Sequence, residues 1–442
     1  MSALARYFNQ KGKNVAGYDR SITELTKRLQ SEGIAVNYLT EEDTIPINYR
    51  DVENTLVVFT PAISKQNPIL NYFLNRGFEC LKRAEVLGQL SKNIKTIAVA
   101  GTHGKTTVSS MIAYLLKQGG VKINAFLGGI SRDFGTNLLL DEDADIMVTE
   151  ADEYDRSFLQ LNPNQLVITS IDADHLDIYS NHEDLINTYK QLVNQLEKNG
   201  YLLSKPLVLK VLEVSDVVYS ESFSIEEEAD ITATNIRVES GAFIFDYHSP
   251  ACIIEGIVCG LPGIHNVENA VAAISIALKH GLDPEEVKQS IGSFKGVKRR
   301  FDVHLKTDEI VYIDDYAHHP EELRMLLASV RELYPKKKIT AVFQPHLYSR
   351  TRDFGDEFAS VLSTADELIL LDLYPAREEP IEGIDSNWLA KKTGKKNVNV
   401  CAKNQLINLL KSKQVEVLLT IGAGDVDTLV EPIINYYESI IS

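Results

Sequence analysis

The first part of the chain alternates between a helical spacing of apolar positions and short apolar runs. The helical spacing predicts helices over residues 2–11, 22–31 and 67–77, and the runs predict strands over 14–19 and 54–59. Helices that alternate with strands are typical of a parallel sheet. The chain opens directly on a helix, with no strand before it.

A second region with the same alternation starts near residue 93. It predicts strands over 96–100, 146–150 and 166–171, helices over 108–118 and 265–280, and period-two strands between about 225 and 258. A third region starts near residue 296, with strands expected over 310–314, 338–343, 367–373 and 416–421 and helices over 321–333 and 356–362.

These regions predict an α/β protein of three domains. Residues 1–92 are expected to form a Rossmann-like domain that opens on a helix, and residues 93–296 a central α/β domain, which the loop GTHGKTT described below assigns to the P-loop ATPase type. Residues 297–442 are expected to form a second Rossmann-like domain, because βα alternation of this kind builds doubly wound sheets.

Composition excludes several classes of protein. The 442 residues carry 45 Lys+Arg against 62 Asp+Glu, a net charge of −17, and 44% of them are hydrophobic. This is the composition of a globular chain and not of a disordered or fibrous one. The acidic balance argues against a nucleic-acid partner, which needs a basic face. The chain has no apolar run of roughly 20 residues, so we expect no membrane span.

Cysteine spacing and the amino-terminal residues indicate the compartment. Cys80, Cys252, Cys259 and Cys401 lie far apart and form no C-x-x-C pair, which fits reduced thiols in the cytoplasm. The opening MSALARYFNQKGKN has no apolar core and no small-residue cleavage site, so no signal peptide is expected.

The segment GTHGKTT lies between the strand expected at 96–100 and the helix after it. Glycines let the backbone fold tightly round an oxyanion, and the N–H groups that start a helix favour negative charge. Lys105 can reach the β- and γ-phosphates of a nucleotide, and the Thr106 hydroxyl is placed for Mg²⁺. Val99 stands where the usual motif has its first glycine, so this is a variant loop. The strand-before, helix-after context disfavours the alternative of a simple tight turn.

Acidic and histidine residues follow two of the expected strands. Glu150 ends the run IMVTE, and His175 lies in DADH just past LVITSI. Both lie at carboxyl ends of parallel strands, where such sheets bind ligands. Alone, each is equally well a solvated loop or a structural histidine. Together with the phosphate loop, they predict a Mg²⁺ site.

Polar clusters also begin the helix at 265–280 and fill the third region's loops. His265, Asn266 and Asn269 lie in one turn, where they either cap the helix or form a site for a purine edge. KRRFD (298–302), DDYAHHP (314–320) and the run 343–352 lie where strands or linkers end in loops, and such loops carry function on a rigid scaffold. The alternative for each one alone is a solvated polar loop.

These motifs together resemble the Mur ligase superfamily of ATP-dependent amide-forming enzymes. The segments that carry the resemblance are GTHGKTT (101–107), EADEYDRSF (150–158), DADHLD (172–177), PGIHNVENA (262–270), RRFD (299–302), DDYAHHP (314–320), QPHLYSRTRDF (344–354) and LYPAREEP (373–380). They extend over nearly the whole chain. DDYAHHP and QPH-x-YSRT are the segments most similar to the branch that adds alanine.

The resemblance implies ATP and Mg²⁺ as cofactors, and UDP-N-acetylmuramate and L-alanine as substrates of a cytoplasmic monomer or homodimer. It implies that ATP phosphorylates the lactyl carboxylate of the sugar. The acyl phosphate then reacts with alanine, which yields ADP and phosphate in peptidoglycan precursor synthesis. Because the oxygen of a carboxylate is a poor leaving group, this activation must precede amide formation.

The resemblance also implies roles for individual residues. The ATP contacts would be Gly101, Thr102, His103, Gly104, Lys105, Thr106, Thr107, His265, Asn266, Asn269, Arg300 and Asp315. The metal ligands would be Thr106, Glu150 and His175. Tyr316, His318 and Arg350 would form the amino-acid pocket, and Lys105, His175, His318 and Arg350 would be catalytic. Lys190 lies in the position of a lysine that is carbamoylated in sister ligases.

The chain departs from the family pattern in two places. Relatives have a strand and a G-x-G-G-x-G turn immediately before the segment that matches MSALAR, so we expect the first strand and a loop for the UDP diphosphate to be missing. Leu347 stands where some relatives carry a basic residue, although Arg350 and Arg352 are available for a carboxylate.

Three alternative functions follow from the same residues. A ligase of the peptide-recycling branch would accept a preformed peptide in place of alanine. A nucleotide-binding regulator without ligase activity would use the phosphate loop alone. A dinucleotide oxidoreductase is disfavoured, because no G-x-G-x-x-G precedes Asp19.

Overall fold

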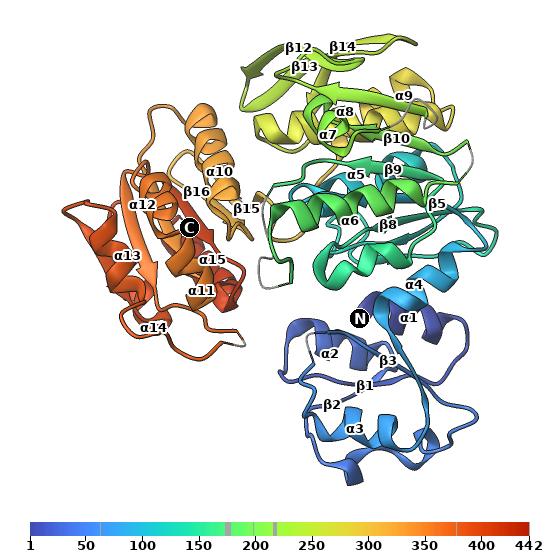
Figure 1. The fold of residues 1–442 in the computed structure, drawn as a ribbon. Coiled ribbons are helices and arrows are strands. Elements are labelled where there is room, and N and C mark those ends of the chain that lie inside the picture. Colours follow the sequence, from blue (N-terminus) through green and yellow to red (C-terminus); the bar gives the residue numbers. More distant parts are fainter. Residues whose placement is uncertain (62, 173–177, 198, 215–218, 377, 442) are drawn as a thin grey trace. The chain divides into compact units, whose positions relative to one another are not determined.

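The computed structural model describes residues 1–61, 63–172, 178–197, 199–214, 219–376 and 378–441. The chain divides into two compact units. The first comprises Met1–Thr232, His248–Cys252 and Val271–Ser290, and the second comprises Ala233–Tyr247, Ile253–Ala270 and Ile291–Ser442. The α/β fold class predicted from the sequence is confirmed (Figure 1).

The amino-terminal region of the first unit consists of short helices and two separate pairs of strands. Its elements are α1 (Ser2–Gln10), β1 (Ala16–Tyr18), α2 (Glu24–Ser31), β2 (Ala35–Asn37), η1 (Glu42–Thr44), η2 (Ile47–Tyr49), β3 (Leu56–Phe59), α3 (Pro68–Asn75), β4 (Glu79–Lys82) and α4 (Arg83–Ser91). The strands β1 and β2 pair in parallel, as do β3 and β4.

The local sequence explains where two of these helices begin. The Thr23 hydroxyl accepts a hydrogen bond from the backbone N–H of Thr26 at 3.2 Å and caps α2. The Asn67 side chain caps α3 at 3.1 Å, and Pro68 follows at a position where a helix tolerates proline. The predicted strands at 14–19 and 54–59 were right in place and too long by a few residues.

The rest of the first unit is built on a mainly parallel sheet. Its elements are β5 (Lys95–Ala100), α5 (Lys105–Gln118), β6 (Ile123–Phe126), β7 (Leu138–Leu139), β8 (Ile146–Glu150), η3 (Tyr154–Gln160), β9 (Gln165–Ile168), α6 (His182–Asn194), β10 (Tyr201–Ser204), α7 (Pro206–Leu212) and β11 (Tyr219–Ser224). The strand order is β11-β10-β9-β5-β8-β6-β7, with β7 antiparallel to β6. The order places β5 between β8 and β9, so the loop after β5 lies between two other strand ends.

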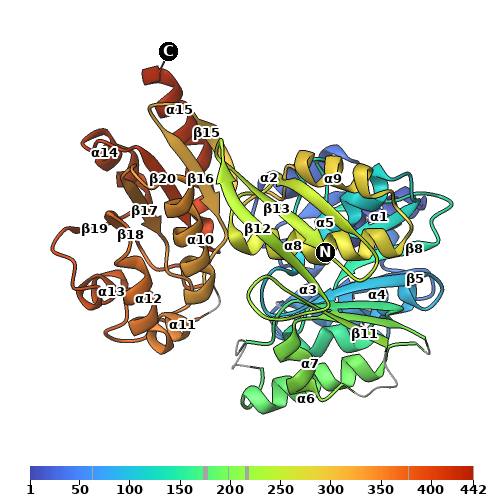
Figure 2. The same ribbon diagram turned by 90° about the horizontal axis from the view of Figure 1, so that it is seen from above.

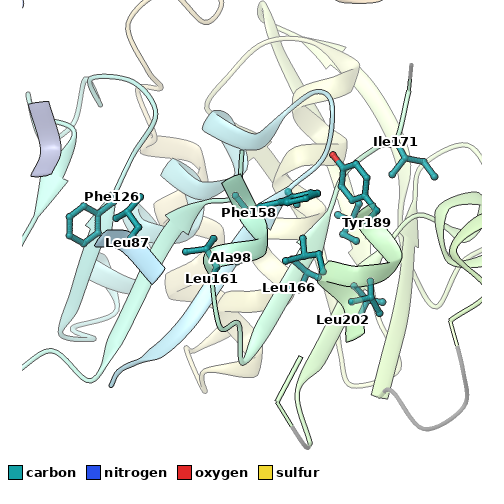
Figure 3. Packing of buried hydrophobic residues seen from close by; sticks show 14 of the residues in the cluster. Leu87, Ala98, Phe126, Phe158, Leu161, Leu166, Ile171, Tyr189 and Leu202 are labelled. Carbon is teal, nitrogen blue, oxygen red and sulfur yellow. The ribbon is translucent and has the colours of Figure 1, made fainter. Parts of the chain in front are cut away.

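Helices cover both faces of this sheet: α6 and α7 lie on one side and α5 on the other (Figure 2). Ala98 and Ala100 of β5 belong to the same core cluster as Tyr189 and Leu192 of α6. Figure 3 shows this core, in which the rings of Phe158 and Tyr189 meet edge to face with centroids 5.0 Å apart. Tight packing on both faces leaves the strand ends as the place for polar side chains.

Two predicted boundaries in this sheet were wrong, and both errors lie at the phosphate loop. The helix predicted at 108 begins at Lys105, because Gly104 in the left-handed region (φ 81°) turns the chain directly into it. The strand predicted to reach residue 171 ends at Ile168. The next residues leave the sheet to bond the loop instead: the Ser170 hydroxyl accepts from the N–H of His103 at 3.1 Å.

The second unit contains two groups of strands. Most of β12 (Ile231–Glu239) lies next to β13 (Ala242–His248), followed by β14 (Ile253–Cys259). The beginning of β12 pairs with β11 of the first unit's sheet at Phe223 and Ile231. Two helices follow, α8 (Ile264–Lys279) and α9 (Pro284–Ser293), and each is divided between the two units.

The carboxyl-terminal part of the second unit is a six-stranded sheet in the order β15-β16-β20-β17-β18-β19. Its elements are β15 (Asp302–Lys306), β16 (Val311–Asp315), α10 (Pro320–Leu333), β17 (Ile339–Phe343), α11 (Tyr348–Asp353), α12 (Gly355–Leu362), β18 (Glu367–Leu371), α13 (Ser386–Lys392), β19 (Val398–Cys401), α14 (Lys403–Lys411), β20 (Val417–Ile421), η4 (Asp425–Leu429) and α15 (Val430–Ile441). Only β15 runs antiparallel to its neighbour.

Alternate residues of this sheet face two separate cores. Val311 and Ile313 of β16 pack with α10 and α12, and Tyr312 packs with α14 and α15. Figure 2 shows α14 and α15 on one side of the sheet and α12 and α13 on the other. The sheet is doubly wound, as the βα alternation predicted. Among the described residues, no helix has the length and apolar character needed to cross a bilayer.

Candidate active site

The loop 101–104 turns tightly between β5 and α5. Gly101 has φ 128°, and a Cβ there would lie 2.1 Å from the hydroxyl oxygen of Thr169. The backbone N–H of Thr102 donates to the Ser170 carbonyl at 3.1 Å, and its hydroxyl donates to the Asp172 carbonyl at 3.0 Å. The hydroxyl of Thr169 donates to the carbonyl of His103. The residues that follow β9 therefore hydrogen-bond the loop 101–104 and pack against it. Only glycine fits at the first position of that loop.

Lys105, the first residue of α5, folds its side chain back over the loop. Its Nζ donates to the carbonyls of Gly101 at 2.5 Å and Thr102 at 3.3 Å, and pairs with Glu153 at 2.9 Å. Burial disfavours the ammonium, but the charges of Glu153, Asp152 and Glu150 outweigh burial and raise the pKa of Lys105. The lysine is therefore held as a cation at the start of a helix, where an anion would bind.

The predicted metal ligands Thr106 and Glu150 lie together. The Thr106 hydroxyl donates to Oε1 of Glu150 at 2.6 Å. Gly128 lies against the other carboxylate oxygen, and a Cβ at that glycine would come within 1.6 Å of Oε2. The third predicted ligand, His175, lies outside the described residues. Among the residues that are described, no group of three or more His, Cys, Asp or Glu could hold a metal ion.

Glu153 is a functional candidate that sequence reasoning named only as part of an acidic run. Its side chain is 2% exposed and pairs with Lys105, and its carbonyl accepts a hydrogen bond from the Tyr179 hydroxyl at 2.5 Å. The next turn places Asp155 and Arg156 at positive φ, 55° and 54°. No local signal distinguishes this glutamate from Glu150, because its burial depends on residues distant in sequence.

Two other predicted residues of the first unit have surface partners. The imidazole Nε2 of His103 lies 3.7 Å from the carboxylate of Asp172. Lys190 lies on α6, and its Nζ forms an ion pair with Glu213 at 2.5 Å. Thr107, the third residue of α5, is buried. Whether Lys190 is carbamoylated stays a prediction.

In the second unit, the start of α8 brings its three polar residues together. The Asn266 side chain donates to the Pro262 carbonyl at 2.6 Å, and the Asn269 side chain donates to Asn266 at 3.1 Å. His265 Nδ1 lies 3.3 Å from the Ser329 hydroxyl of α10, and burial lowers the pKa of this histidine to about 4. The Asn266 side chain therefore bonds back to the turn before the helix as a donor, whereas an N-cap side chain would accept from a backbone N–H.

Asp315 is the last residue of β16, and Arg300 lies in the segment just before β15. The Asp315 carboxylate accepts from the backbone N–H of Phe301 at 2.6 Å and of Ala317 at 2.7 Å. Burial raises the pKa of Asp315 to about 6, and Arg300 opposes this rise. The Arg300 guanidinium lies 5.1 Å from the ring centroid of Tyr316. The predicted phosphate and amino-acid residues are therefore neighbours here.

His318 is surrounded by aromatic and charged groups. Its ring meets those of Tyr316 and His346 edge to face at 5.3 and 6.1 Å. Burial lowers the pKa of His318 to about 4. The negative charge of Glu322 raises this pKa, and the positive charge of Arg350 lowers it further. Arg350 lies on α11, which follows Leu347 at φ 69°. The structure thus places Tyr316, His318 and Arg350 near one another at the ends of β16 and β17.

Arg299 is a second residue that sequence reasoning missed, because only its neighbour Arg300 received a role. Its guanidinium donates to the carbonyls of Gly422 and Gly424, the latter at 3.3 Å, and to Asp314 at 3.3 Å. It thereby joins the loop before β15 to the loop after β20. The adjacent basic residues KRR in the sequence could have suggested such a structural partner.

Comparison with known proteins adds to this geometry. Three family descriptions match the chain: "Mur ligase family, catalytic domain" over residues 1–95, "Mur ligase middle domain" over 99–277 and "Mur ligase, glutamate ligase domain" over 299–424. A curated UDP-N-acetylmuramate–L-alanine ligase from Parabacteroides distasonis is 47% identical over 98% of this chain and 94% of its own. The chain belongs to the Mur ligase family.

Solved structures of Mur ligases share the fold. The UDP-N-acetylmuramate–alanine ligase MurC of Thermotoga maritima matches with a TM-score of 0.85 and 25% identity, over 99% of this chain and 96% of that one. A murein peptide ligase from Psychrobacter arcticus matches with a TM-score of 0.70 and 20% identity, over 98% and 95%. The predicted family is thus confirmed, and the chain is an enzyme similar to alanine-adding Mur ligases. The roles of individual residues stay predictions.

Proposed function

We propose that this Mur ligase joins L-alanine to the lactyl carboxylate of UDP-N-acetylmuramate at the expense of ATP. The observation that carries the proposal is the 47% identity, over 98% of the chain, to a ligase named for these two substrates. The product would be a precursor of peptidoglycan. The loop residues DDYAHHP and QPHLYSRT, which resemble this branch, are both at strand ends in the second unit.

The proposed reaction has two steps. A carboxylate oxygen of the sugar attacks the γ-phosphorus of ATP, the bond to the β,γ-bridging oxygen breaks, and ADP leaves. The amine of alanine then attacks the acyl carbon, the bond from carbon to the phosphate oxygen breaks, and inorganic phosphate leaves with the electron pair. The amine gives up a proton. The protein's tasks are positioning and charge neutralisation.

In the first unit, Lys105 and the loop amides would bind the phosphates of ATP. The Lys105 ammonium donates to the Gly101 carbonyl and pairs with Glu153. These contacts keep it beside the loop before the nucleotide binds. Preorganised charge of this kind stabilises the transferring phosphoryl group without reorganisation. Gly104 in the left-handed region presents the first amides of α5 to the same place.

The side chains of Thr106 and Glu150 fit Mg²⁺, because they supply hard oxygen donors 2.6 Å apart beside a glycine that leaves the carboxylate room. With His175 they would hold the ion, which when bound supplies positive charge to the phosphate oxygens.

In the second unit, Arg300 would contact phosphate and Asp315 would lie on the ribose side, with His265, Asn266 and Asn269 near the adenine. Arg350 would pair with the alanine carboxylate, for which a planar guanidinium is suited. His318, neutral at pH 7 because burial lowers its pKa to about 4, would accept the proton of the amine. Tyr316 lies edge to face with His318 and completes this pocket.

We further propose a cytoplasmic enzyme, monomeric or homodimeric, with domains at 1–92, 93–296 and 297–442. The free thiols of Cys80, Cys252, Cys259 and Cys401 support the compartment.

The test is phosphate release from ATP with Mg²⁺ and UDP-N-acetylmuramate, with and without L-alanine, and with a tripeptide in parallel. Release that requires alanine would support the proposal. Release only with the tripeptide would assign the protein to the peptide-recycling branch. ATP binding without stimulation by either would indicate a nucleotide-binding protein without ligase activity.

A further inference from the structure

The carboxylate of Glu322 lies beside two side chains to which the proposed function gives separate roles. Glu322 is in the first turn of α10, and 16% of its side chain is exposed. Its Oε2 accepts hydrogen bonds from the backbone N–H of His318 at 2.8 Å and of His319 at 3.2 Å. The same oxygen lies 3.2 Å from the ring Nδ1 of His318, and Oε1 lies 3.8 Å from Nη1 of Arg300.

The groups around Nδ1 of His318 decide which ring nitrogen carries the proton. The Tyr316 carbonyl oxygen lies 3.0 Å from Nδ1, and the Glu322 carboxylate oxygen lies 3.2 Å from the same nitrogen. A carbonyl and an ionised carboxylate only accept hydrogen bonds. Two N–H donors and a nearby guanidinium favour the ionised form of Glu322. Nδ1 must therefore be the donor, and Nε2 is the unprotonated nitrogen of the neutral ring.

We propose that Glu322 is a positioning residue that keeps the proton of His318 on Nδ1, so that Nε2 accepts the proton of the incoming amine. The same carboxylate also orients Arg300, and so joins the phosphate and amine sides of the second unit. The role of Nε2 as acceptor rests on the proposed function, whereas the tautomer does not.

The proton transfer completes the second chemical step. As the C–N bond forms and the bond from carbon to the phosphate oxygen breaks, the N–H proton of alanine moves to Nε2. The ring then carries protons on both nitrogens. The new cation faces the Glu322 carboxylate through Nδ1–H, and this contact stabilises it.

Helix capping is the competing explanation for Glu322. It is the third residue of α10, and with His319 it forms a capping box. Capping explains the two backbone hydrogen bonds. It does not explain the approach of the same carboxylate to the His318 ring and to Arg300, and these contacts make a separate prediction.

Glu321 provides a matched control in the same helical turn. Its carboxylate pairs with Arg324 at 3.0 Å, and 40% of its side chain is exposed. The Glu322→Gln variant keeps an acceptor oxygen for one backbone N–H but removes the charge. The amide can also donate to Nδ1 of His318. Glu321→Gln removes a charge from the same turn without touching the histidine.

The experiment records long-range ¹H–¹⁵N spectra of the full chain labelled in histidine, at pH 7. His318→Gln assigns the His318 signals by their loss. We expect the Nδ1–H pattern in the wild type and in Glu321→Gln, and conversion toward Nε2–H in Glu322→Gln. An Nε2–H pattern or an imidazolium in the wild type would overturn the proposal, even if Glu322→Gln failed to fold. An unchanged pattern in a folded Glu322→Gln would also overturn it.

A kinetic measurement tests the positioning role. Alanine-dependent phosphate release should fall about 10- to 100-fold in kcat in Glu322→Gln, with a thermal midpoint close to that of Glu321→Gln. A lower midpoint with unchanged kcat would reduce Glu322 to a helix cap. If the wild type shows the Nδ1–H pattern but no alanine-dependent release, the proposed function fails while the tautomer assignment stands.

Discussion

The phosphate loop of the first unit and the polar loops of the second unit are built in different ways. The phosphate loop is one contiguous segment, from Gly101 to Thr107, and two glycines and the start of a helix determine its conformation. The second combines residues from the loop before β15 and the ends of β16, β17 and β20, which lie far apart in the sequence. A local motif can be read from its residues alone, whereas an assembled pocket depends on strand order.

The two regions also differ in how charge is balanced. Around Lys105, three acidic residues outweigh the cost of burial and raise the pKa of the lysine. Around His318, burial dominates and lowers the pKa to about 4. The first region therefore holds a permanent cation that can bind an anion. The second holds a neutral ring that can accept a proton.

The largest expected effect is at Lys105. We expect Lys105→Ala to abolish ATP-dependent phosphate release, because it removes the cation of the loop. It also removes the cation that pairs with the buried carboxylate of Glu153, which should cost about 3–5 kcal/mol of stability. Phosphate release and thermal unfolding measure both effects. The control is Lys117→Ala, near the end of the same helix, which breaks a surface ion pair with Asp141. It should leave phosphate release and thermal stability nearly unchanged. Product formation by the folded Lys105→Ala variant would contradict the assignment.

A smaller effect is expected where Gly128 contacts Glu150. The Cβ of Gly128→Ala would lie 1.6 Å from a carboxylate oxygen, so the Glu150 carboxylate must leave the position in which it accepts from the Thr106 hydroxyl. We expect the Mg²⁺ concentration for half-maximal activity to rise about 10- to 100-fold. A titration of activity with Mg²⁺ measures this. Gly17→Ala, at a glycine with open space around it, is the control. An unchanged Mg²⁺ requirement would separate Glu150 from the metal.

Arg350 tests the assembled region. We expect Arg350→Ala to raise KM for L-alanine about tenfold or more with little change in kcat, because a charge-assisted hydrogen bond to the substrate is lost. Steady-state kinetics with varied alanine measures this. Arg352→Ala is the control, because that side chain is exposed and pairs with Asp353 at 2.7 Å. A fall in kcat with KM unchanged would contradict the assigned role.

The last prediction concerns stability and pH at His265, which bears on folding and not on catalysis. Its pKa is about 4 in the folded protein and about 6.5 when unfolded, so the unfolded state binds more protons between these values. Stability should therefore fall as pH drops through this window, by up to about 3 kcal/mol. Denaturant unfolding should show a shallower dependence in His265→Gln. Ser329→Ala keeps the titrating ring and should keep the slope; equal slopes in wild type and His265→Gln would show that His265 stays solvated.

Much of the fold could be predicted from periodicity. The central strands of the two large sheets (β5, β8, β9, β16, β17, β18 and β20) and the helices at 265–280 and 321–333 were predicted within a few residues. Short elements such as β2 and β6 escaped prediction. They have only three and four residues, which are too few to display a hydrophobic period. The end of β9 was wrong because Thr169 and Ser170 bond the phosphate loop, a contact between residues about 67 positions apart.

The sequence by itself determined the phosphate loop, the family and the residues available for chemistry, because glycine conformation and helix starts are local properties. Only the tertiary structure decided which groups meet. It placed Glu153 beside Lys105 and joined two loops through Arg299, since the parallel strand order brings distant strand ends to one edge. It also decided which of these groups are charged, because burial and neighbouring charges depend on packing and not on sequence position.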